Sequence, residues 1–184
     1  IVDVDHGAQP LVDASGDRYL AVNGEIYNHK ALEASLETPY VFKTRSDCEV
    51  ILPLWAAHGE GVADRLSGIF AFVGVDRRTG DFIIARDPIG VCPSYWGRDA
   101  QGSLWVASEL KALINDCKTI EDFPPGHVWT RASGGPVPYY KPGWREYDAV
   151  KDTPFSVDGR RTALEDAVRA QLMCDVPYGV LLSG

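Results

Sequence analysis

Two short segments of the sequence carry residue types that can stabilise an oxyanion and bind an amine. Asn23 and Gly24 place a side-chain amide beside a glycine N–H, the two hydrogen-bond donors that a tetrahedral oxyanion needs. Glu25 adds a carboxylate that can hold an ammonium group, and Asp47 supplies another. Each has an ordinary structural explanation, because Asn-Gly is a frequent turn pair and an acidic residue at a helix start complements the helix dipole. Taken alone, these residues leave both interpretations open.

Two further segments have patterns typical of ordered loops. Residues 86–90, Arg-Asp-Pro-Ile-Gly, require a tight loop after a buried strand, and we interpret the Arg–Asp pair as a structural brace for it. Residues 180–184, Val-Leu-Leu-Ser-Gly, have the pattern of a buried strand that ends in a Ser-Gly turn. Ligands bind at the carboxyl edge of open α/β sheets, and backbone N–H groups hold phosphates there when a helix follows. This second segment is therefore a candidate phosphate loop.

Other common sites are absent from the sequence. It has no dinucleotide-binding glycine pattern, no P-loop, no zinc-protease helix and no nucleophile elbow. The cysteines, at positions 48, 92, 117 and 174, have neither metal-ligand nor redox spacing, and the histidines lack ligand spacing as well. We therefore expect free thiols and no metal site.

The composition indicates a folded, acidic protein. The chain has 184 residues, of which 26 are acidic and 18 basic, for a formal net charge of −8. This balance disfavours a nucleic-acid partner, which needs a basic face. With 45% hydrophobic and 10% aromatic residues, the chain can bury a core. No apolar run approaches the ~20 residues that cross a membrane and no signal peptide is seen, so we expect a cytoplasmic protein without a membrane partner.

Short strands dominate the elements that must position these residues. The pattern of apolar runs and turn residues predicts hairpins over 11–26, 68–87, 95–106 and 127–140, the first with a strand that ends at residues 23–25. A further short strand is expected at 41–42. Helices are predicted over 29–37 with Asn28 as cap, over 46–55 from a Ser46/Glu49 capping box, and over 108–114. Pro53 conflicts with the second helix, because an interior proline costs about 3 kcal/mol.

The composition changes after residue 140. Residues 141–157 are poor in aliphatic side chains and are interpreted as a linker. Asp158 is expected to cap a helix, and an apolar strand follows over 176–182, which is typical of the opening of an α/β domain. The expected organisation is thus a strand-rich domain over 1–140, a linker over 141–157 and the start of a second domain over 158–184. Both chain ends interrupt a strand pattern, so we expect a fragment of a longer protein.

Taken together, these segments resemble the glutamine-hydrolysing asparagine synthetases of bacteria and plants. The Arg-Asp loop alone is shared with other class II amidotransferases. The matching stretches are 1–4 with 7–11, 21–28, 46–51, 86–87 with 90 and 93, 107–113 and 175–184, among which NGEIYN and DVPYGVLLSG are the most specific in combination.

The resemblance implies a fold and a reaction. The fold is α+β, an incomplete αββα sandwich of the N-terminal-nucleophile hydrolases, followed by the first helix and strand of an α/β ATP-pyrophosphatase-type domain. Glutamine is hydrolysed to glutamate and ammonia, which travels through an internal tunnel. The ammonia attacks a β-aspartyl-adenylate made from aspartate and ATP with Mg²⁺, giving asparagine, AMP and pyrophosphate. A homodimer is compatible with this resemblance.

The resemblance also implies site residues. The Asn23 side chain and the Gly24 N–H form the oxyanion hole, and Asp47 binds the α-amino group of glutamine. The implied glutamine-binding residues are Ile1, Val2, Asn23, Gly24, Glu25 and Asp47. The implied ATP-contacting residues are Leu181, Ser183 and Gly184.

The sequence departs from this family in several places. The family's nucleophile, an N-terminal Cys, and the Arg that holds the glutamine carboxylate would both lie before Ile1. Cys48 is expected inside a helix, without a free amine, and cannot replace that nucleophile. Ser94 stands where the family usually has Leu. We therefore expect the 184-residue chain to be inactive by itself, and to aggregate or order only in part.

Two alternatives to asparagine synthesis remain. Related class II amidotransferases act on other carboxylates, and some form β-lactams. A non-catalytic module that binds an amino acid or a partner is the other alternative, although the intact set of Asn23, Gly24, Glu25 and Asp47 weighs against it.

Overall fold

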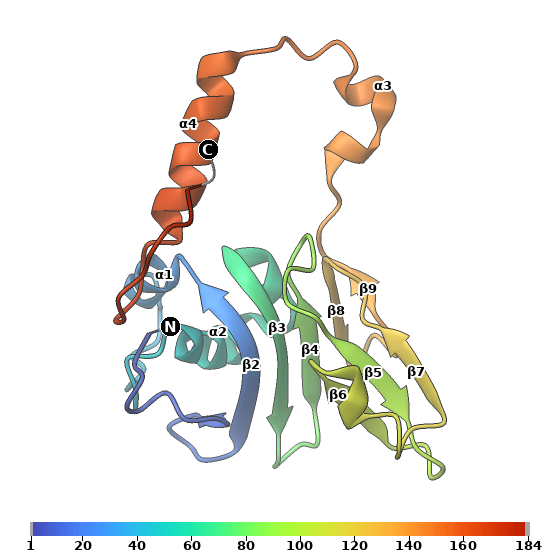
Figure 1. Ribbon diagram of the computed structural model, residues 1–184. Helices are drawn as coiled ribbons and strands as arrows, with labels where there is room; N and C mark the ends of the chain where they lie inside the picture. The colour runs from blue at the N-terminus through green and yellow to red at the C-terminus, as the bar shows by residue number, and fades with distance from the viewer. Residues whose placement is uncertain (1, 183–184) are drawn as a thin grey trace.

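Two antiparallel sheets form most of this computed structural model, which describes residues 2–182 (Figure 1). The larger sheet has the strand order β1-β2-β3-β4-β8-β9 and the smaller one β6-β5-β7. The four predicted hairpins are confirmed. The strands are β1 (Leu11–Val12), β2 (Arg18–Ile26), β3 (Gly68–Asp76), β4 (Phe82–Arg86), β5 (Tyr95–Arg98), β6 (Leu104–Ala107), β7 (Thr119–Asp122), β8 (His127–Thr130) and β9 (Val137–Pro138).

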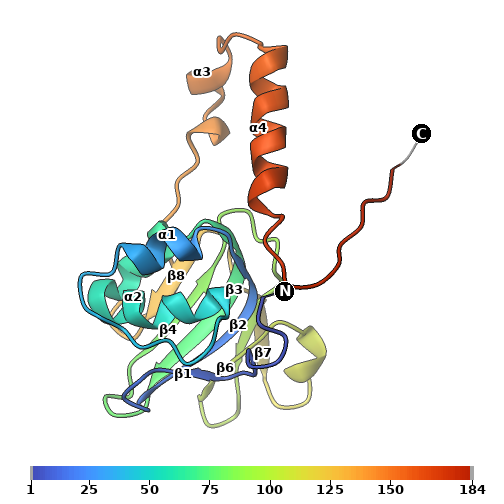
Figure 2. The same ribbon diagram turned by 90° about the vertical axis from the view of Figure 1, so that its left-hand side faces the viewer.

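One face of the larger sheet is covered by helical segments (Figures 1 and 2). Successive strand residues point to opposite faces, so Leu20, Val22 and Ile26 of β2 lie together under these helices. They pack with buried residues of β3 and of the second helix, which gives the main core. The segments are α1 (His29–Ala34), the 3₁₀ helix η1 (Asp47–Val50), α2 (Ile51–His58) and the 3₁₀ helix η2 (Gly59–Arg65).

A second core joins the two sheets. Ile84, Trp129 and Phe123 are buried in it, and Trp96 of the smaller sheet packs edge-on against Trp129 with ring centroids 4.9 Å apart. Residues 2–182 thus show the helix–sheet–sheet part of the predicted αββα sandwich.

The C-terminal part extends away from the sheets (Figures 1 and 2). It contains the 3₁₀ helix η4 (Gly143–Arg145), α3 (Tyr147–Val150) and α4 (Val157–Ala170). Every residue of α4 is exposed. The Ser156 hydroxyl accepts the Gly159 N–H and caps α4, so the expected cap Asp158 lies in the first turn instead. The predicted strand over 176–182 is wrong, because this segment has no strand partner in the described part of the chain and Leu182 is 94% exposed.

One other predicted helix forms but is shorter than expected, and two other predicted elements are wrong. The 29–37 helix ends at Ala34, and the Asn28 side chain does not cap it because its amide bonds to Arg65 O and Ser67 N, both at 3.0 Å. The 41–42 segment is not a strand, and Val41 is 75% exposed. The 108–114 helix is reduced to the 3₁₀ helix η3 (Leu110–Ala112), and β7 had no clear signal in the sequence.

The capping box at residues 46–49 forms only by half. The Ser46 hydroxyl accepts the Cys48 N–H at 3.4 Å, but the Glu49 carboxylate instead accepts the N–H groups of Lys43 and Thr44. The helix therefore begins with a 3₁₀ turn, and Pro53 falls in the first turn of α2, where its missing N–H is tolerated. This resolves the conflict over Pro53. No helix in residues 2–182 has the length and apolar content needed to cross a membrane.

Candidate functional site

The Asn23-Gly24-Glu25 tripeptide lies within β2 and is not a turn. Asn23 is opposite Ala71 and Gly24 is opposite Phe70 in the antiparallel ladder with β3. Gly24 has a φ of +148°, and a Cβ there would lie 2.0 Å from Ile69 O. The position therefore requires glycine for the close approach of two backbones, which an ordinary Asn-Gly turn does not.

The backbone of β2 turns a row of N–H groups away from β3. The Phe70 C=O accepts the Asp87 N–H, and the Phe70 N–H donates to the Asp87 carboxylate, so both backbone groups of Phe70 point away from β2. In an antiparallel pair, the backbone groups of the opposite residue then point away as well, which places the N–H and C=O of Gly24 on the outer side of β2. Two flanking positions agree: the Val22 N–H donates to the Gln9 side chain, and the Ile26 N–H donates to the Asp47 carboxylate. The Gly24 N–H thus lies between two positions whose N–H groups are bound by side chains.

Asn23 lines a cavity of about 550 Å³ between the two sheets. The side chain of Asn23 is on the face of β2 opposite the main core and is exposed to this space. The cavity is bounded by β3 at Ala71 to Val73 and by the end of β6 with the loop after it, and Ser94 also contributes. A cavity of this size is large enough for an amino-acid substrate.

Asp47 is 3% exposed and sits at the start of η1. Its Oδ2 accepts the Ile26 N–H at 2.6 Å, which fixes the carboxylate two residues beyond Gly24. Burial raises the pKa of Asp47 above its ordinary value, and the Ile26 N–H works against that rise. A buried carboxylate in this position favours a cationic partner, such as an α-amino group.

Cys48 is next to Asp47 but is not suited to nucleophilic attack. Its thiol donates to Gly24 O at 3.7 Å and is itself buried. Burial, followed by the charge of Asp47, raises the pKa of this thiol far above the range in which a thiolate forms. The expectation that Cys48 cannot replace an N-terminal nucleophile therefore has a physical basis.

Glu25 lies on the same face of β2 as Asn23, by the alternation of the strand. It is half-buried. Burial raises the pKa of Tyr27, and the negative charge of Glu25 raises it further, so the two side chains are close. The tripeptide and Asp47 together therefore place two donors and two carboxylates along one stretch of β2.

The N-terminal segment approaches the same site. Asp3 Oδ2 accepts the Arg45 N–H at 2.7 Å, so the residue after Val2 is tied to the loop two residues before Asp47. Val2 is half-buried there. Ile1, the other implied glutamine-binding residue of this segment, lies outside the described residues.

Gln9 is a site residue that sequence reasoning missed. Its side chain makes two hydrogen bonds with Val22, each of 2.6 Å, and it lines the cavity with Asn23. Gln9 stands at the register position opposite Val22 that continues the β1–β2 pairing, with a side-chain amide in place of a backbone amide. In the sequence, the one local indication of this role was the neighbouring Pro10, which has no N–H group to pair with another strand.

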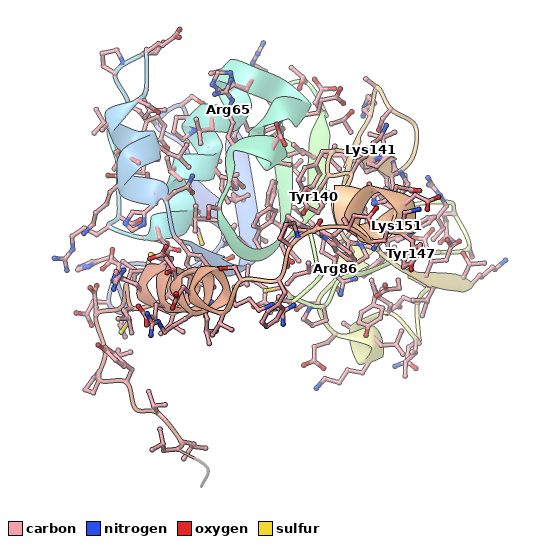
Figure 3. All side chains as sticks on the ribbon, turned by 90° about the horizontal axis from the view of Figure 1, so that it is seen from above. Arg65, Arg86, Tyr140, Lys141, Tyr147 and Lys151 are labelled. Atoms are coloured by element: carbon pink, nitrogen blue, oxygen red, sulfur yellow. The ribbon has the colours of Figure 1, made fainter. Side chains whose placement is uncertain are left out.

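The Arg86-Asp87 loop is a brace, as predicted. The Asp87 carboxylate is 1% exposed and accepts five backbone N–H groups, those of Phe70, Ile89, Gly90, Val91 and Cys92. The Arg86 guanidinium bonds to Cys92 O at 2.7 Å and Phe123 O at 2.6 Å. The Tyr139 hydroxyl donates to Arg86 O at 2.8 Å. Figure 3 labels Arg86 together with Tyr140 and Lys141, the residues at which the chain leaves the sheets toward α3.

Of the three implied ATP residues, Leu181 lies in the described part of the chain. Leu181 is fully exposed, at 101%, and the segment around it is extended. Ser183 and Gly184 lie outside the described residues. In residues 2–182, no group of three or more His, Cys, Asp or Glu side chains is arranged to hold a metal ion.

Comparison with known families decides what this arrangement belongs to. The sequence model of the glutamine amidotransferase domain family matches residues 1–134. The chain belongs to this family. It is 50% identical over its whole length to asparagine synthetase B (glutamine-hydrolyzing) of Escherichia coli, of which it spans 33%. It is 48% identical, again over its whole length, to the glutamine-hydrolyzing asparagine synthetase of Brassica oleracea, of which it spans 31%.

Solved structures agree with the family assignment. The fold matches that of an allosteric regulatory enzyme of purine biosynthesis with a TM-score of 0.58 and 27% identity, over 71% of this chain and 30% of that one. It also matches glutamine phosphoribosylpyrophosphate amidotransferase of B. subtilis, with a TM-score of 0.56 over 71% of this chain and 31% of that one. The predicted class II amidotransferase fold is therefore confirmed, and the chain spans about a third of the length of the curated relatives it matches.

Proposed function

We propose that the protein containing this chain hydrolyses glutamine at β2 and uses the ammonia to convert aspartate to asparagine. The observation that carries the proposal is the placement of Asn23 and Gly24 in β2, with the side-chain amide facing the cavity and the N–H on the outer side of the strand. Family membership supports glutamine as the substrate. Identities of 45–50% over the whole chain to asparagine synthetases support aspartate as the acceptor.

The residues of this chain have distinct parts in the hydrolysis. A thiol attacks the side-chain amide of glutamine, and negative charge develops on the amide oxygen. The Asn23 amide and the Gly24 N–H stabilise that oxygen, which is a contribution of about 3–4 kcal/mol per donor in comparable sites. Asp47 and Glu25 bind the α-amino group. We propose that the N-terminal cysteine typical of this family, which would lie upstream of Ile1, supplies the thiol. Cys48 is not suited to this role, because it is buried and burial raises the pKa of its thiol.

The proposal extends to ATP, which activates the carboxylate of aspartate, and to Mg²⁺ as its counter-ion. Leu181, Ser183 and Gly184 are the residues proposed to contact the nucleotide. The four cysteines are free, which supports a reducing compartment such as the cytoplasm. A homodimer completes the proposal, since two-fold dimers are the commonest symmetric assembly.

The test follows ¹⁵N from the amide of glutamine in the full-length protein supplied with aspartate, Mg²⁺ and ATP. Labelled asparagine, with glutamate, AMP and pyrophosphate in equal amounts, is the expected result. Asn23→Ala lowers glutamine-dependent ammonia release by about 100- to 1000-fold. The same variant still synthesises asparagine when free ammonia is supplied, because that route bypasses the glutamine site.

Asn28→Ala is the matched control, since this asparagine is also close to β2 but bonds to Arg65 and Ser67 outside the cavity. Ammonia release that survives in Asn23→Ala would place the oxyanion hole elsewhere. Glutamate release without labelled asparagine would show that the acceptor is another carboxylate.

A further inference from the structure

Asp3 has the most unusual backbone conformation of the side-chain-bearing residues. It is 3% exposed and has a φ of +58°, and no other non-glycine residue in 2–182 has a positive φ. Aspartate adopts this left-handed region more readily than most residues, but it still does so at a cost. Such a conformation persists where the surrounding contacts determine it, so the contacts of Asp3 are informative.

The carboxylate of Asp3 holds the loop that presents Asp47. Its Oδ2 accepts the Arg45 N–H at 2.7 Å, and its Oδ1 lies 3.1 Å from His6 Nδ1 and 4.0 Å from the Arg45 guanidinium. The bonded N–H of Arg45 lowers the pKa of Asp3, so the carboxylate stays charged. Asp47 follows Arg45 by two residues and bonds to Ile26 of β2.

The main chain of Asp3 is held as firmly as its side chain. Its carbonyl oxygen accepts the Gly7 N–H at 2.9 Å, and a Cβ on Gly7 would lie 2.7 Å from that oxygen. Its N–H donates to Asp175 Oδ2 at 2.9 Å. Asp175 lies beyond α4, and both views place this segment beside the N-terminal segment that precedes β1 (Figures 1 and 2). Met173 and Cys174 are half-buried there, whereas all of α4 is exposed.

We propose that Asp3 is a positioning residue for glutamine binding, and that Asp175 supports it from the segment after α4. The inference rests on the proposed function, because Val2 and Asp47 belong to the proposed glutamine pocket. Val2 precedes Asp3 directly, so a displaced Asp3 moves Val2 and the Asp47 loop together. In the described chain no hydrogen bond joins Asp3 to Asn23 or Gly24, so the effect falls on substrate binding and not on the chemical step.

Steady-state kinetics of the full-length protein test the role of Asp3. Asp3→Ala raises the KM for glutamine by about tenfold and changes kcat by less than about threefold, the pattern of lost binding. Asp3→Asn restores a KM close to that of the wild type, because an asparagine oxygen can still accept the Arg45 N–H and asparagine tolerates a positive φ. Asp5→Ala, which removes an exposed carboxylate from the same segment, leaves both constants unchanged.

Asp175 tests the second half of the proposal in a variant that cannot disturb the core, because this side chain is exposed. Asp175→Ala raises the KM for glutamine by at least about threefold, and Asp175→Asn, which keeps an acceptor oxygen, does not. Asp152→Ala is the exposed control from the linker. Synthesis from free ammonia stays constant in all of these variants and shows that they are folded.

Three results would overturn the inference. The first is an unchanged KM for glutamine in both alanine variants. The second is a loss of kcat in Asp3→Ala that matches its loss of ammonia-dependent synthesis, which would mean a purely structural role. The third is a wild-type protein that releases no ammonia from glutamine, which would contradict the proposed function itself and, with it, this inference.

Discussion

Gly24 shows how one residue can combine a steric and a chemical requirement. Its backbone approaches Ile69 and Phe70 so closely that any side chain would overlap with β3. The register that brings Gly24 opposite Phe70 also directs the Gly24 N–H outward. A substitution at this position therefore disturbs folding and the oxyanion donor together, and the two effects need separate measurements.

Gly24→Ala is expected to destabilise the protein more than Gly16→Ala does. Gly16 also has a positive φ, +79°, but nothing lies within 4 Å of its Cβ position. Alanine at Gly16 thus costs about 1–2 kcal/mol of backbone strain alone. At Gly24 the overlap with Ile69 O adds about 1–3 kcal/mol more. Urea unfolding of the two variants measures the difference, and equal midpoints would contradict the close approach.

Asp47→Asn is expected to show a pH-dependent change in stability. The pKa of Asp47 is raised in the folded protein above its ordinary value of 3.8, chiefly by burial, so the folded state binds the proton more tightly than the unfolded state. Ionised Asp47 therefore lowers stability at neutral pH, and this penalty disappears as the pH falls through the raised pKa toward 3.8.

The neutral asparagine never has this penalty. The stability of Asp47→Asn relative to the wild type is therefore highest at neutral pH and declines as the pH falls. Urea unfolding of both proteins between neutral and acidic pH measures the trend. If the stability of Asp47→Asn relative to the wild type rises on acidification, the pKa of Asp47 is lowered in the folded protein and not raised.

At the scale of the elements, loops and turns support the strands, and those strands could be predicted from the sequence. Asp87 binds five N–H groups and joins the loop after β4 to Phe70, the residue opposite Gly24. The Glu49 carboxylate likewise accepts the backbone N–H groups of Lys43 and Thr44, in the loop before η1. Both carboxylates are almost fully buried, and each replaces hydrogen bonds that regular structure would otherwise supply.

Asp87→Ala is expected to lower the free energy of unfolding by about 3–5 kcal/mol, because it leaves the buried N–H groups of Phe70 and Cys92 without an acceptor. Asp99→Ala is the control. Asp99 also accepts several N–H groups in a turn, but those groups are exposed and water can replace it. Guanidinium unfolding gives both values, and a similar loss in the two variants would mean that burial of the loop is not the cause.

The hairpins could be predicted because alternating apolar runs and Gly-containing turns are local signals. The brace role of Arg86 and Asp87 was predictable for the same reason, since Pro88 and Gly90 require a tight loop. The continuation of β2 through Asn23 and Gly24 was not, because their turn propensity is local and the pairing with β3 is not. Long-range bonds also explain the error at Asn28, whose side chain binds Arg65 and Ser67 and does not cap the helix.

At the scale of the whole molecule, the chain divides into a packed part and an extended part. The two cores contain residues up to Trp129, with Val137 and Tyr139 packed against the first. Beyond residue 140 the side chains are mostly exposed, and the hydrogen bond to Asp3 is a link back from Asp175. This division agrees with the predicted boundary at 140, which stays a prediction.

Limited trypsin digestion of the chain tests that boundary. The first cleavages are expected after Arg145, Lys151 or Arg160, which are exposed and make few contacts. The product that persists contains the sheets and ends near residue 145. Early cleavage at Lys30 or Lys111, within the packed part, would show that the predicted core is not an independent unit. Mass spectrometry of the first products identifies the cut sites.

The outer side of β2 has a consequence for self-association. Between Val22 and Ile26 this edge is bonded by the side chains of Gln9, Cys48 and Asp47, not by another strand. An uncovered edge would offer a template on which a strand of a second molecule could add. Here side chains already bind the outer backbone groups of Val22 and Ile26 on either side of Gly24. The edge can therefore present the Gly24 N–H to a small substrate while it stays closed to an incoming strand, which would need the whole row of groups.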